Sequence, residues 1–128
     1  MLNYENFKTG GSKPIYRQIL EYIKRAAASG QIEDGEELPS RRVLSALWGI
    51  NPNTVQKAFA QLEEEEIIES RSGAKSCATL SAGKIAQIRE ELLQDDMRES
   101  IRALKQMGIS KQEALNFIDS CWEEDYER

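Results

Sequence analysis

The sequence predicts a mainly α-helical fold with one small β-hairpin. Apolar residues recur at three- and four-residue steps in five segments of the 128-residue chain, which is the periodicity of amphipathic helices. Segment 67–80 instead reads as two extended runs on either side of a glycine-containing turn. With an apolar fraction of 40%, the chain has material for one modest core and an appended helical unit, but too little for a large enzyme cavity.

The first helix is expected to begin near Pro14 and to stop at Gly30. Proline suits the first turn of a helix, and glycine commonly ends one. The apolar residues between them keep helical spacing: Ile15, Ile19, Ile23 and Ala26. Segment 31–38 then carries an Asp-Gly turn and a few extended residues before Pro39, which disfavours helix at the residue preceding it.

Two further helices are expected to follow closely, over residues 41–48 and 52–65. Ser40 is a good N-cap for the first of them, and Asn51 caps the second, which has a proline at its first position. The connection between them is about three residues long and contains Gly49, which is typical of a helix-turn-helix. The expected apolar side of the earlier helix is Val43, Leu44 and Leu47, and that of the later helix is Val55, Ala58, Phe59 and Leu62.

The opposite face of the later helix has the chemistry needed to read DNA. It consists of Asn53, Gln56, Lys57 and Ala60. Asn and Gln can pair bidentately with adenine, Lys can donate to guanine or to a phosphate, and a small Ala permits close approach to a thymine methyl. No carboxylate occurs in segment 39–62, so phosphates would not be repelled there. Ser40 and the start of its helix are expected to hold a backbone phosphate, with Arg42 adding charge.

The charge distribution is compatible with such a face on an acidic protein. The net charge is −5, which by itself argues against nucleic acid. Residues 1–80 carry ten Lys and Arg against eleven Asp and Glu, whereas residues 81–128 carry seven against eleven, so most of the acidity belongs to the tail. The charges in segment 39–62 are all positive: Arg41, Arg42 and Lys57. For Arg41, a solvated surface charge and a phosphate contact are equally open.

A short hairpin is expected after the third helix. The glutamate run 63–66 is typical of a solvated helix end. Residues 67–71 look extended, residues 72–75 look like a turn, and residues 76–80 make the return strand. A helix-turn-helix followed by a short hairpin is a winged helix.

Four motifs in order resemble the N-terminal winged-helix domain of the GntR family of bacterial transcription regulators, over roughly residues 13–79. They are "P-I-Y-x-Q-I", "S-G-x-I…G…L-P-S-x-R", "G-I-N-P-N-T-V" and "L-E-x-E-x-I-I-E". The "N-P-N-T-V" motif and the short tail are most similar to those of the YtrA-type subfamily. In that subfamily the C-terminal part is a pair of helices used for dimerisation rather than a ligand-binding domain.

The resemblance implies where DNA is contacted. It implies contacts from Ser40 and Arg42 before and within the second helix, and from Gly73 and Lys75 in the wing. On the recognition helix, 52–65, it implies contacts from Asn53, Thr54, Gln56 and Lys57. This chain departs from the family in three places: Gln56 stands where many members have arginine, Glu66 stands where a glycine is usual, and segment 72–78 differs from the usual wing sequence. A glutamate is unfavourable for a left-handed turn, and the wing is expected to contact the minor groove weakly.

The tail predicts two more amphipathic helices. Apolar residues keep helical spacing from Lys84 to Met107, Gly108 closes this helix, and Ser110 opens another with a capping box. The apolar face of the last helix is Ala114, Leu115, Ile118, Cys121 and Trp122. Two helices alone cannot bury these faces well, so pairing with a second copy of the chain is expected. We therefore predict a DNA-binding domain over residues 1–80 and a helical dimerisation extension over 81–128.

Composition argues against several other classes of protein. There is no histidine, and Cys77 and Cys121 lie far apart, so no metal site, disulfide framework or cofactor is indicated. No glycine-rich phosphate loop or ordered carboxylate constellation supports an enzymatic reaction. No apolar run approaches the roughly 18–20 residues needed to cross a bilayer, and the start lacks a signal-peptide core, so a cytoplasmic location is expected. The tail is too short to enclose a small-molecule effector within one chain.

Two functions stay open from the sequence. The first is a sequence-specific regulator of transcription, a repressor in our prediction, that binds an inverted-repeat operator in double-stranded DNA as a homodimer. The recognition helix and the wing would carry this binding, because one recognition helix reads only a few base pairs and such proteins commonly pair. The alternative is a winged-helix module that binds another protein without specific DNA binding, motivated by the overall acidity and the atypical wing.

Overall fold

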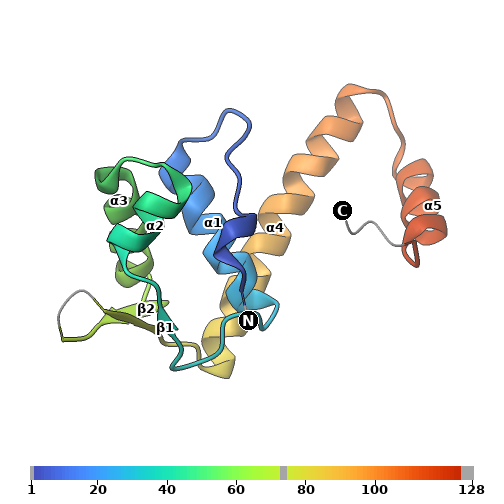
Figure 1. Ribbon diagram of the computed structural model, residues 1–128. Helices are drawn as coiled ribbons and strands as arrows, with labels where there is room; N and C mark the ends of the chain where they lie inside the picture. The colour runs from blue at the N-terminus through green and yellow to red at the C-terminus, as the bar shows by residue number, and fades with distance from the viewer. Residues whose placement is uncertain (1, 73–74, 125–128) are drawn as a thin grey trace. The chain divides into compact units, whose positions relative to one another are not determined.

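The computed structural model describes residues 2–72 and 75–124 (Figure 1). The elements, in chain order, are the 3-10 helix η1 (Tyr4–Asn6), α1 (Ile15–Ala28), β1 (Glu37–Leu38), α2 (Arg41–Trp48), α3 (Pro52–Glu64), β2 (Ile68–Ser70), β3 (Ser76–Ala78), α4 (Ala82–Gln106) and α5 (Lys111–Cys121). They form two compact units, Met1–Glu90 and Glu91–Arg128. The predicted fold class, a helix-turn-helix with a small antiparallel sheet followed by two helices, is confirmed.

Helix α1 forms the centre of the N-terminal unit. Pro14 precedes its first residue, and Gly30 follows its end with a φ of 84°, a left-handed conformation that glycine adopts at little cost. The amides of Gln31 and Ile32 donate to the carbonyl of Ala26, which satisfies the open end of the helix. The side that faces the core is buried and comprises Ile19, Leu20, Ile23, Ala26 and Ala27.

Helix α2 begins and ends as the sequence predicts. The hydroxyl oxygen of Ser40 accepts a hydrogen bond from the amide of Val43 at 3.1 Å, and Gly49 ends the helix in the left-handed conformation. The predicted apolar side is wrong in part, because only Leu44 is buried while Val43 and Leu47 are 55% and 46% exposed. The inward face is instead formed by the buried Leu44 and the half-buried Arg41, Ser45 and Trp48. The spacing of these four residues places them on one face of the helix. Because the face mixes polar and apolar residues, apolar periodicity in the sequence does not reveal it.

Helix α3 packs across α1 and α2 through its predicted stripe. Val55, Ala58, Phe59 and Leu62 are all 0% exposed. The side-chain oxygen of Asn51 accepts from the amide of Asn53 at 2.8 Å, and Pro52 occupies the first helical position. Because both ends of the turn between α2 and α3 are capped, the turn fixes the direction in which α3 leaves the core.

The sheet has three strands, one more than the predicted hairpin. Its order is β1-β3-β2, with both pairs antiparallel. Strand β1 has only two residues, and Glu37 lies opposite Cys77 across the ladder. A strand this short has no periodicity of its own, so only the pairing with β3 defines it.

A left-handed turn connects α3 to β2. Glu66 has a φ of 61°, the conformation that glycine would supply at this position, so the turn forms despite the glutamate. The hydroxyl group of Thr79 donates to the carbonyl of Glu66 at 2.8 Å. This bond ties the turn to the chain segment that follows β3.

The N-terminal segment covers α2, which the sequence did not predict. The indole nitrogen of Trp48 donates to the carbonyl of Tyr4 at 2.8 Å, and the ring of Phe7 lies between those of Trp48 and Tyr22 at centroid distances of 4.8 and 5.0 Å. Leu2 and Phe7 are buried. Trp48 is therefore a packing anchor between α2 and the N-terminal segment.

The start of α4 completes the core of the N-terminal unit. Ile88 is 1% exposed, and the ammonium of Lys84 donates to the carbonyl of Glu65 at 2.9 Å. The helix runs without interruption through Asp95 and Asp96.

In the described part of the chain, none of the helices combines the length and the apolar character that a membrane span requires.

The C-terminal unit contains the rest of α4 and α5. Gly108, with a φ of 75°, ends the longer helix, and the hydroxyl oxygen of Ser110 accepts from the amide of Glu113 at 3.1 Å at the start of α5. Large apolar side chains are exposed throughout this unit: Leu93, Met97, Ile101, Met107, Leu115, Phe117, Ile118 and Trp122. This unit therefore does not bury its own apolar faces.

Candidate nucleic-acid interface

The outward face of α3 presents the residues that the sequence placed there. Asn53, Gln56, Lys57 and Ala60 are all exposed. In the described chain, the side-chain amides of Asn53 and Gln56 make no hydrogen bond to another residue. Their donors and acceptors are therefore available to base edges in a groove.

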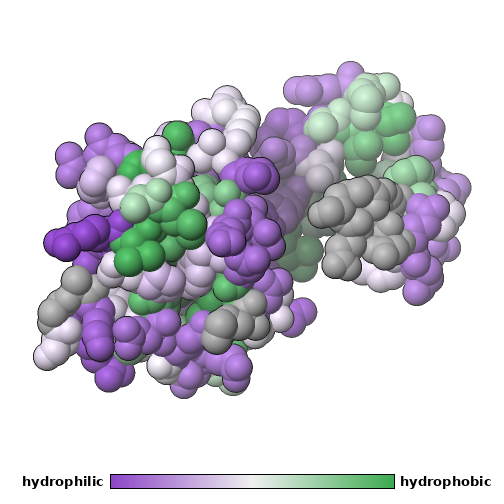
Figure 2. Space-filling model, in the orientation of Figure 1, coloured by the Kyte–Doolittle hydropathy of each residue, from purple (hydrophilic) through white to green (hydrophobic). Residues whose placement is uncertain are grey.

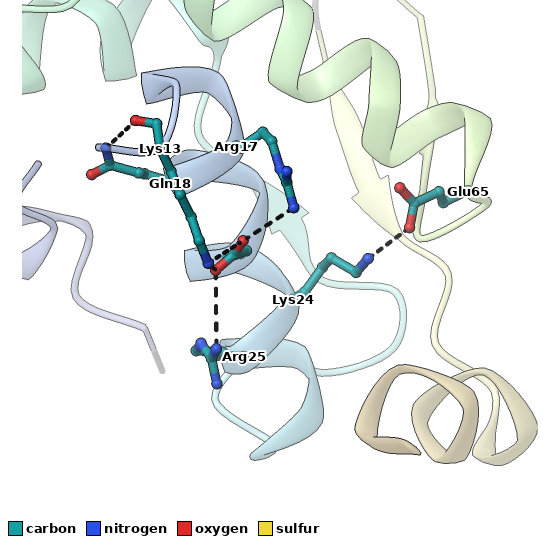
Figure 3. A network of polar contacts seen from close by, with 7 residues as sticks. Lys13, Arg17, Gln18, Lys24, Arg25 and Glu65 are labelled. Atoms are coloured by element: carbon teal, nitrogen blue, oxygen red, sulfur yellow. Dashed lines mark hydrogen bonds and ion pairs between the residues drawn. The ribbon is translucent and has the colours of Figure 1, made fainter. Parts of the chain in front are cut away.

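Most basic residues of the N-terminal unit outside α2 and α3 are already paired with carboxylates. Figure 3 shows the α1 network, in which Lys13, Arg17 and Arg25 surround the carboxylate of Glu21 at 3.2, 3.8 and 4.0 Å. In the wing, Arg71 pairs with Glu69 at 2.7 Å. These pairs reduce the positive charge that α1 and the wing offer to an anion.

The basic residues of the helix-turn-helix differ in this respect. Within the described ranges, Arg41, Arg42 and Lys57 form no ion pair with a carboxylate. Arg42 and Lys57 are exposed, whereas Arg41 is half-buried. Because segment 39–62 contains no acidic residue, these three charges form the positive surface of an acidic protein.

Two of the three cations lie against aromatic rings. The guanidinium carbon of Arg41 is 5.4 Å from the centroid of the Phe59 ring. The ammonium of Lys57 is 4.1 Å from the centroid of the Tyr16 ring. Such cation–π contacts hold a charge in place without neutralising it. Tyr16 was not a predicted site residue, because only the packing of α1 against α3 brings its ring to Lys57 and no local sequence pattern shows this packing.

Arg41 has one further property that bears on its role. Its Nε atom is buried and has no hydrogen-bond partner in the part of the chain that the structure describes. Stacking on Phe59 and burial of Nε place the stem of Arg41 in the α2–α3 contact. Its role in DNA contact stays a prediction.

Ser40 and Thr54 stand at the starts of α2 and α3. The Ser40 oxygen accepts the capping bond from Val43, so its hydroxyl proton is free to be donated to an anion. Thr54 is half-buried. Neither contact with DNA is tested by the geometry, and both stay predictions.

The predicted wing residues are placed less completely. Lys75 is exposed and its ammonium is 3.9 Å from a carboxylate oxygen of Glu37, a loose surface pair that a phosphate can replace. Gly73 lies outside the described residues. The wing contact therefore stays a prediction.

The end of α3 is fixed by a half-buried ion pair. Lys24 of α1 donates to Glu65 at 2.8 Å (Figure 3). Gln61 donates to the other oxygen of the same carboxylate at 2.9 Å. Burial alone would raise the pKa of Glu65, but the hydrogen bonds from Lys24 and Gln61 and the charges of Lys24 and Lys84 outweigh it and hold the pKa below its usual value. One member of the predicted solvated glutamate run is therefore structural.

Two surface cavities of the N-terminal unit differ in charge. A cavity of about 570 Å³ is lined by Asp34, Glu63, Glu66 and Glu69 with a single cation, Lys84, which makes it unsuitable for a phosphate. A cavity of about 440 Å³ lies between the starts of α1 and α3. Its lining includes Tyr16, Asn51, Asn53, Thr54 and Lys57, with one positive charge and no carboxylate.

The surface of α2 also has an apolar patch. Val43 and Leu47 lie one helical turn apart and are both about half exposed. Figure 2 shows hydrophobic side chains gathered over α2. The patch adjoins the positive residues of the helix-turn-helix but adds no charge to it.

Comparison with known proteins agrees with this geometry. The sequence model of "Bacterial regulatory proteins, gntR family" matches residues 15–75. The HTH-type transcriptional repressor YtrA of Bacillus subtilis (strain 168) is 40% identical over 89 residues, which are 65% of this chain and 68% of YtrA. The chain belongs to the GntR family.

This GntR-family protein is similar to short members of the family over most of its length. The uncharacterised HTH-type transcriptional regulator YhcF of the same bacterium is 29% identical over 112 residues, covering 88% of this chain and 93% of YhcF. A solved GntR family transcriptional regulator from Listeria monocytogenes is 32% identical, with a TM-score of 0.78 over 88% of this chain and 98% of that one. The likeness to YtrA that the motifs indicated is confirmed, and the protein is a DNA-binding transcription regulator rather than an enzyme.

Proposed function

We propose that this GntR-family regulator is a repressor that binds an inverted-repeat operator as a homodimer, through α3 and the wing. One observation carries the proposal: the polar and basic side chains of the outer surface of α2 and α3 have no carboxylate partner in the described chain, while other basic residues nearby do. A surface kept free of internal pairing in this way is suited to a polyanion.

The residues of this surface divide into two roles. Gln56 and Asn53 read bases, because free amides can donate and accept on one base edge. Arg42, Lys57 and the hydroxyl group of Ser40 hold phosphates, which position the helix without reading sequence. Arg41, Thr54, Gly73 and Lys75 support the same contacts from α2, α3 and the wing.

The exposed apolar side chains of the C-terminal unit support the homodimer. Phe117 and Trp122 are 65% and 75% exposed, and five further large apolar side chains of α4, α5 and the turn between them are 40% exposed or more: Leu93, Met97, Ile101, Met107 and Leu115. Exposed apolar side chains in this number support an interaction site in a water-exposed protein. A second copy offers the same surface and brings a second recognition helix, as an inverted repeat requires.

Repression is favoured over activation by one comparison. YtrA, with 40% identity over most of the present chain, is named a transcriptional repressor. A repressor needs no surface beyond those for DNA and for the second copy, since occupancy of the operator can itself block transcription. It would act in the cytoplasm, where the operator lies.

The decisive experiment is selection of bound sequences from random double-stranded DNA at a stated salt concentration. The expected product is an inverted repeat whose half-sites lie about one helical turn, or a multiple of it, apart. If no sequence were enriched and binding did not depend on salt, a protein-binding module would explain the surface better than a DNA-binding regulator.

Substitutions in α3 test the division of roles. Gln56→Ala should weaken binding by about 1–3 kcal/mol and relax the preference at one base position of each half-site. Lys57→Ala serves as the matched control on the neighbouring residue, since it should weaken all sequences alike and reduce the salt slope by about one per half-site. If Gln56→Ala left both the affinity and the selected sequence unchanged, α3 would not be the reading element.

A further inference from the structure

We infer that Tyr16 of α1 is a positioning residue that holds the Lys57 ammonium ready for a backbone phosphate of DNA at the cavity between α1 and α3. The inference rests on the proposed function and adds to it a residue from outside the helix-turn-helix. Two observations carry it: the ammonium lies 4.1 Å from the centroid of the Tyr16 ring, and both residues line the same cavity of about 440 Å³.

The geometry determines which part of the DNA Lys57 addresses. Lysine has a long and flexible stem, so without a partner its ammonium would sample a wide region around α3. The contact with Tyr16 places it on the α1 side of the helix. Gln56, which is exposed on the same helix, is left to face the bases. Lys57 is therefore directed to the flank of the groove, where the phosphates lie.

The cavity offers one positive charge, that of Lys57, without a competing carboxylate. Asn51 and Thr54 add a side-chain amide and a hydroxyl group to its lining, and Pro14 and Ile15 add an apolar wall. The aromatic ring covers one side of the ammonium and leaves its remaining N–H donors for an anion. The ring does not neutralise the charge as a carboxylate would, so the site keeps its attraction for phosphate.

The Tyr16 ring strengthens binding by ordering Lys57 in advance. A side chain that is already confined loses less conformational freedom when it meets the phosphate. An exposed cation–π contact corresponds to about a two- to five-fold change in an equilibrium constant. We expect an effect of this size at each half-site when the ring is removed.

A double-mutant cycle with the selected operator tests this coupling. Tyr16→Leu should weaken binding about two- to five-fold per half-site while leaving the slope of log K against log salt unchanged, because the ammonium itself remains. Tyr16→Phe keeps the ring and should bind as the unaltered protein does. In a Lys57→Met background, Tyr16→Leu should cause no further loss. Equal losses in both backgrounds would overturn the inference.

Nuclear magnetic resonance of the free protein gives a readout that does not depend on DNA. The Lys57 Hε protons should be shifted upfield by the Tyr16 ring, and this shift should persist in Tyr16→Phe and vanish in Tyr16→Leu. Unshifted Hε protons in the unaltered protein would overturn the inference, even if Tyr16→Leu failed to fold. Millimolar inorganic phosphate should leave these signals in place, whereas operator DNA should move them; the reverse pattern would assign the cavity to a free anion instead.

The outcomes separate this inference from the proposed function. If Lys57→Met and Gln56→Ala both left operator binding intact, the assignment of α3 as the recognition helix would fail. If both weakened binding but Tyr16→Leu did so independently of Lys57, only the role of Tyr16 would fail.

Discussion

Aromatic rings set the positions of charged and polar groups at the residue scale. Lys57 lies against Tyr16, and Arg41 against Phe59. Each pair joins residues from two elements, at sequence separations that no local pattern connects. The sequence therefore predicts which residue types occupy the outer face of α3, because helical periodicity is local, but it does not predict which of their charges are held in place.

The environment of Tyr4 is unfavourable for its hydroxyl group. The hydroxyl is buried and has no hydrogen-bond partner among the residues that the structure describes. Burial, together with the negative charge of Glu36 and the nearby Tyr22, raises the pKa of Tyr4 from its ordinary value of 10.0 to about 12. Both facts favour an apolar ring at this position.

Replacement of Tyr4 by phenylalanine should therefore be tolerated or stabilising. At pH 7, Tyr4→Phe should raise the free energy of unfolding by up to about 1 kcal/mol, because a buried unsatisfied hydroxyl is removed. Tyr22→Phe is the matched control and should lower it by about 1 kcal/mol, since it loses the 2.8 Å bond to the carbonyl of Asn3. Chemical denaturation measures both, and a loss of stability in Tyr4→Phe would contradict the assignment.

The same tyrosine gives a prediction for alkaline pH. The unfolded chain releases the phenol proton near pH 10.0, whereas the folded protein holds it until about pH 12. This titration therefore leaves the free energy of unfolding unchanged below pH 10 and lowers it as the pH rises from 10 toward 12, because only the unfolded chain ionises in that range. Thermal melts across this range should show a steeper decline for the unaltered protein than for Tyr4→Phe, and parallel declines would contradict the raised pKa.

At the scale of elements, the boundaries of α2, α3 and α5 follow from their capping residues. Ser40, Asn51 and Ser110 each accept the expected bond from an amide at the helix start. These signals lie within three residues of the structure they determine, which is why the sequence predicts them. Strand β1 was not predictable in this way, since it is defined by its pairing with β3. Helix η1 does have a local cap, because the side chain of Asn3 accepts from the amide of Glu5, but its three residues are too few to show a helical periodicity.

The turn after α3 offers a test of local strain. Glu66 has a φ of 61°, and an L-residue in the left-handed region costs about 1–2 kcal/mol relative to a right-handed conformation. Glu66→Gly should remove this cost and, after allowance for the freedom that glycine adds to the unfolded chain, raise the free energy of unfolding by about 1 kcal/mol. Urea denaturation at matched protein concentration measures the difference.

A glycine at the last residue of α3 is the control for this test. Glu64→Gly removes the same side chain from a right-handed helical position, so it should lower the free energy of unfolding by up to about 1 kcal/mol. Opposite signs for the two variants would locate the effect in the backbone conformation. Equal signs would mean that loss of a glutamate charge, rather than relief of strain, controls the result.

At the scale of the whole molecule, the two units differ in the chemistry of the side chains that they expose. The N-terminal unit has a buried core and presents free polar and basic groups on α2 and α3. The C-terminal unit leaves large apolar side chains in contact with water. Sequence periodicity alone predicts that the tail is amphipathic, and the exposed fractions show which of its apolar residues the single chain leaves uncovered.

Phe117→Glu should convert the protein from dimer to monomer if the C-terminal unit forms the proposed interface. The side chain is 65% exposed in the single chain, so the substitution places a charge in the interface without disturbing a core. Sedimentation at micromolar concentration should give half the mass, and affinity for the full operator should fall at least tenfold because the half-sites bind independently. Val43→Glu adds the same charge to the 55% exposed apolar patch of α2 and should leave the mass unchanged. A monomeric Val43→Glu beside a dimeric Phe117→Glu would move the interface to α2.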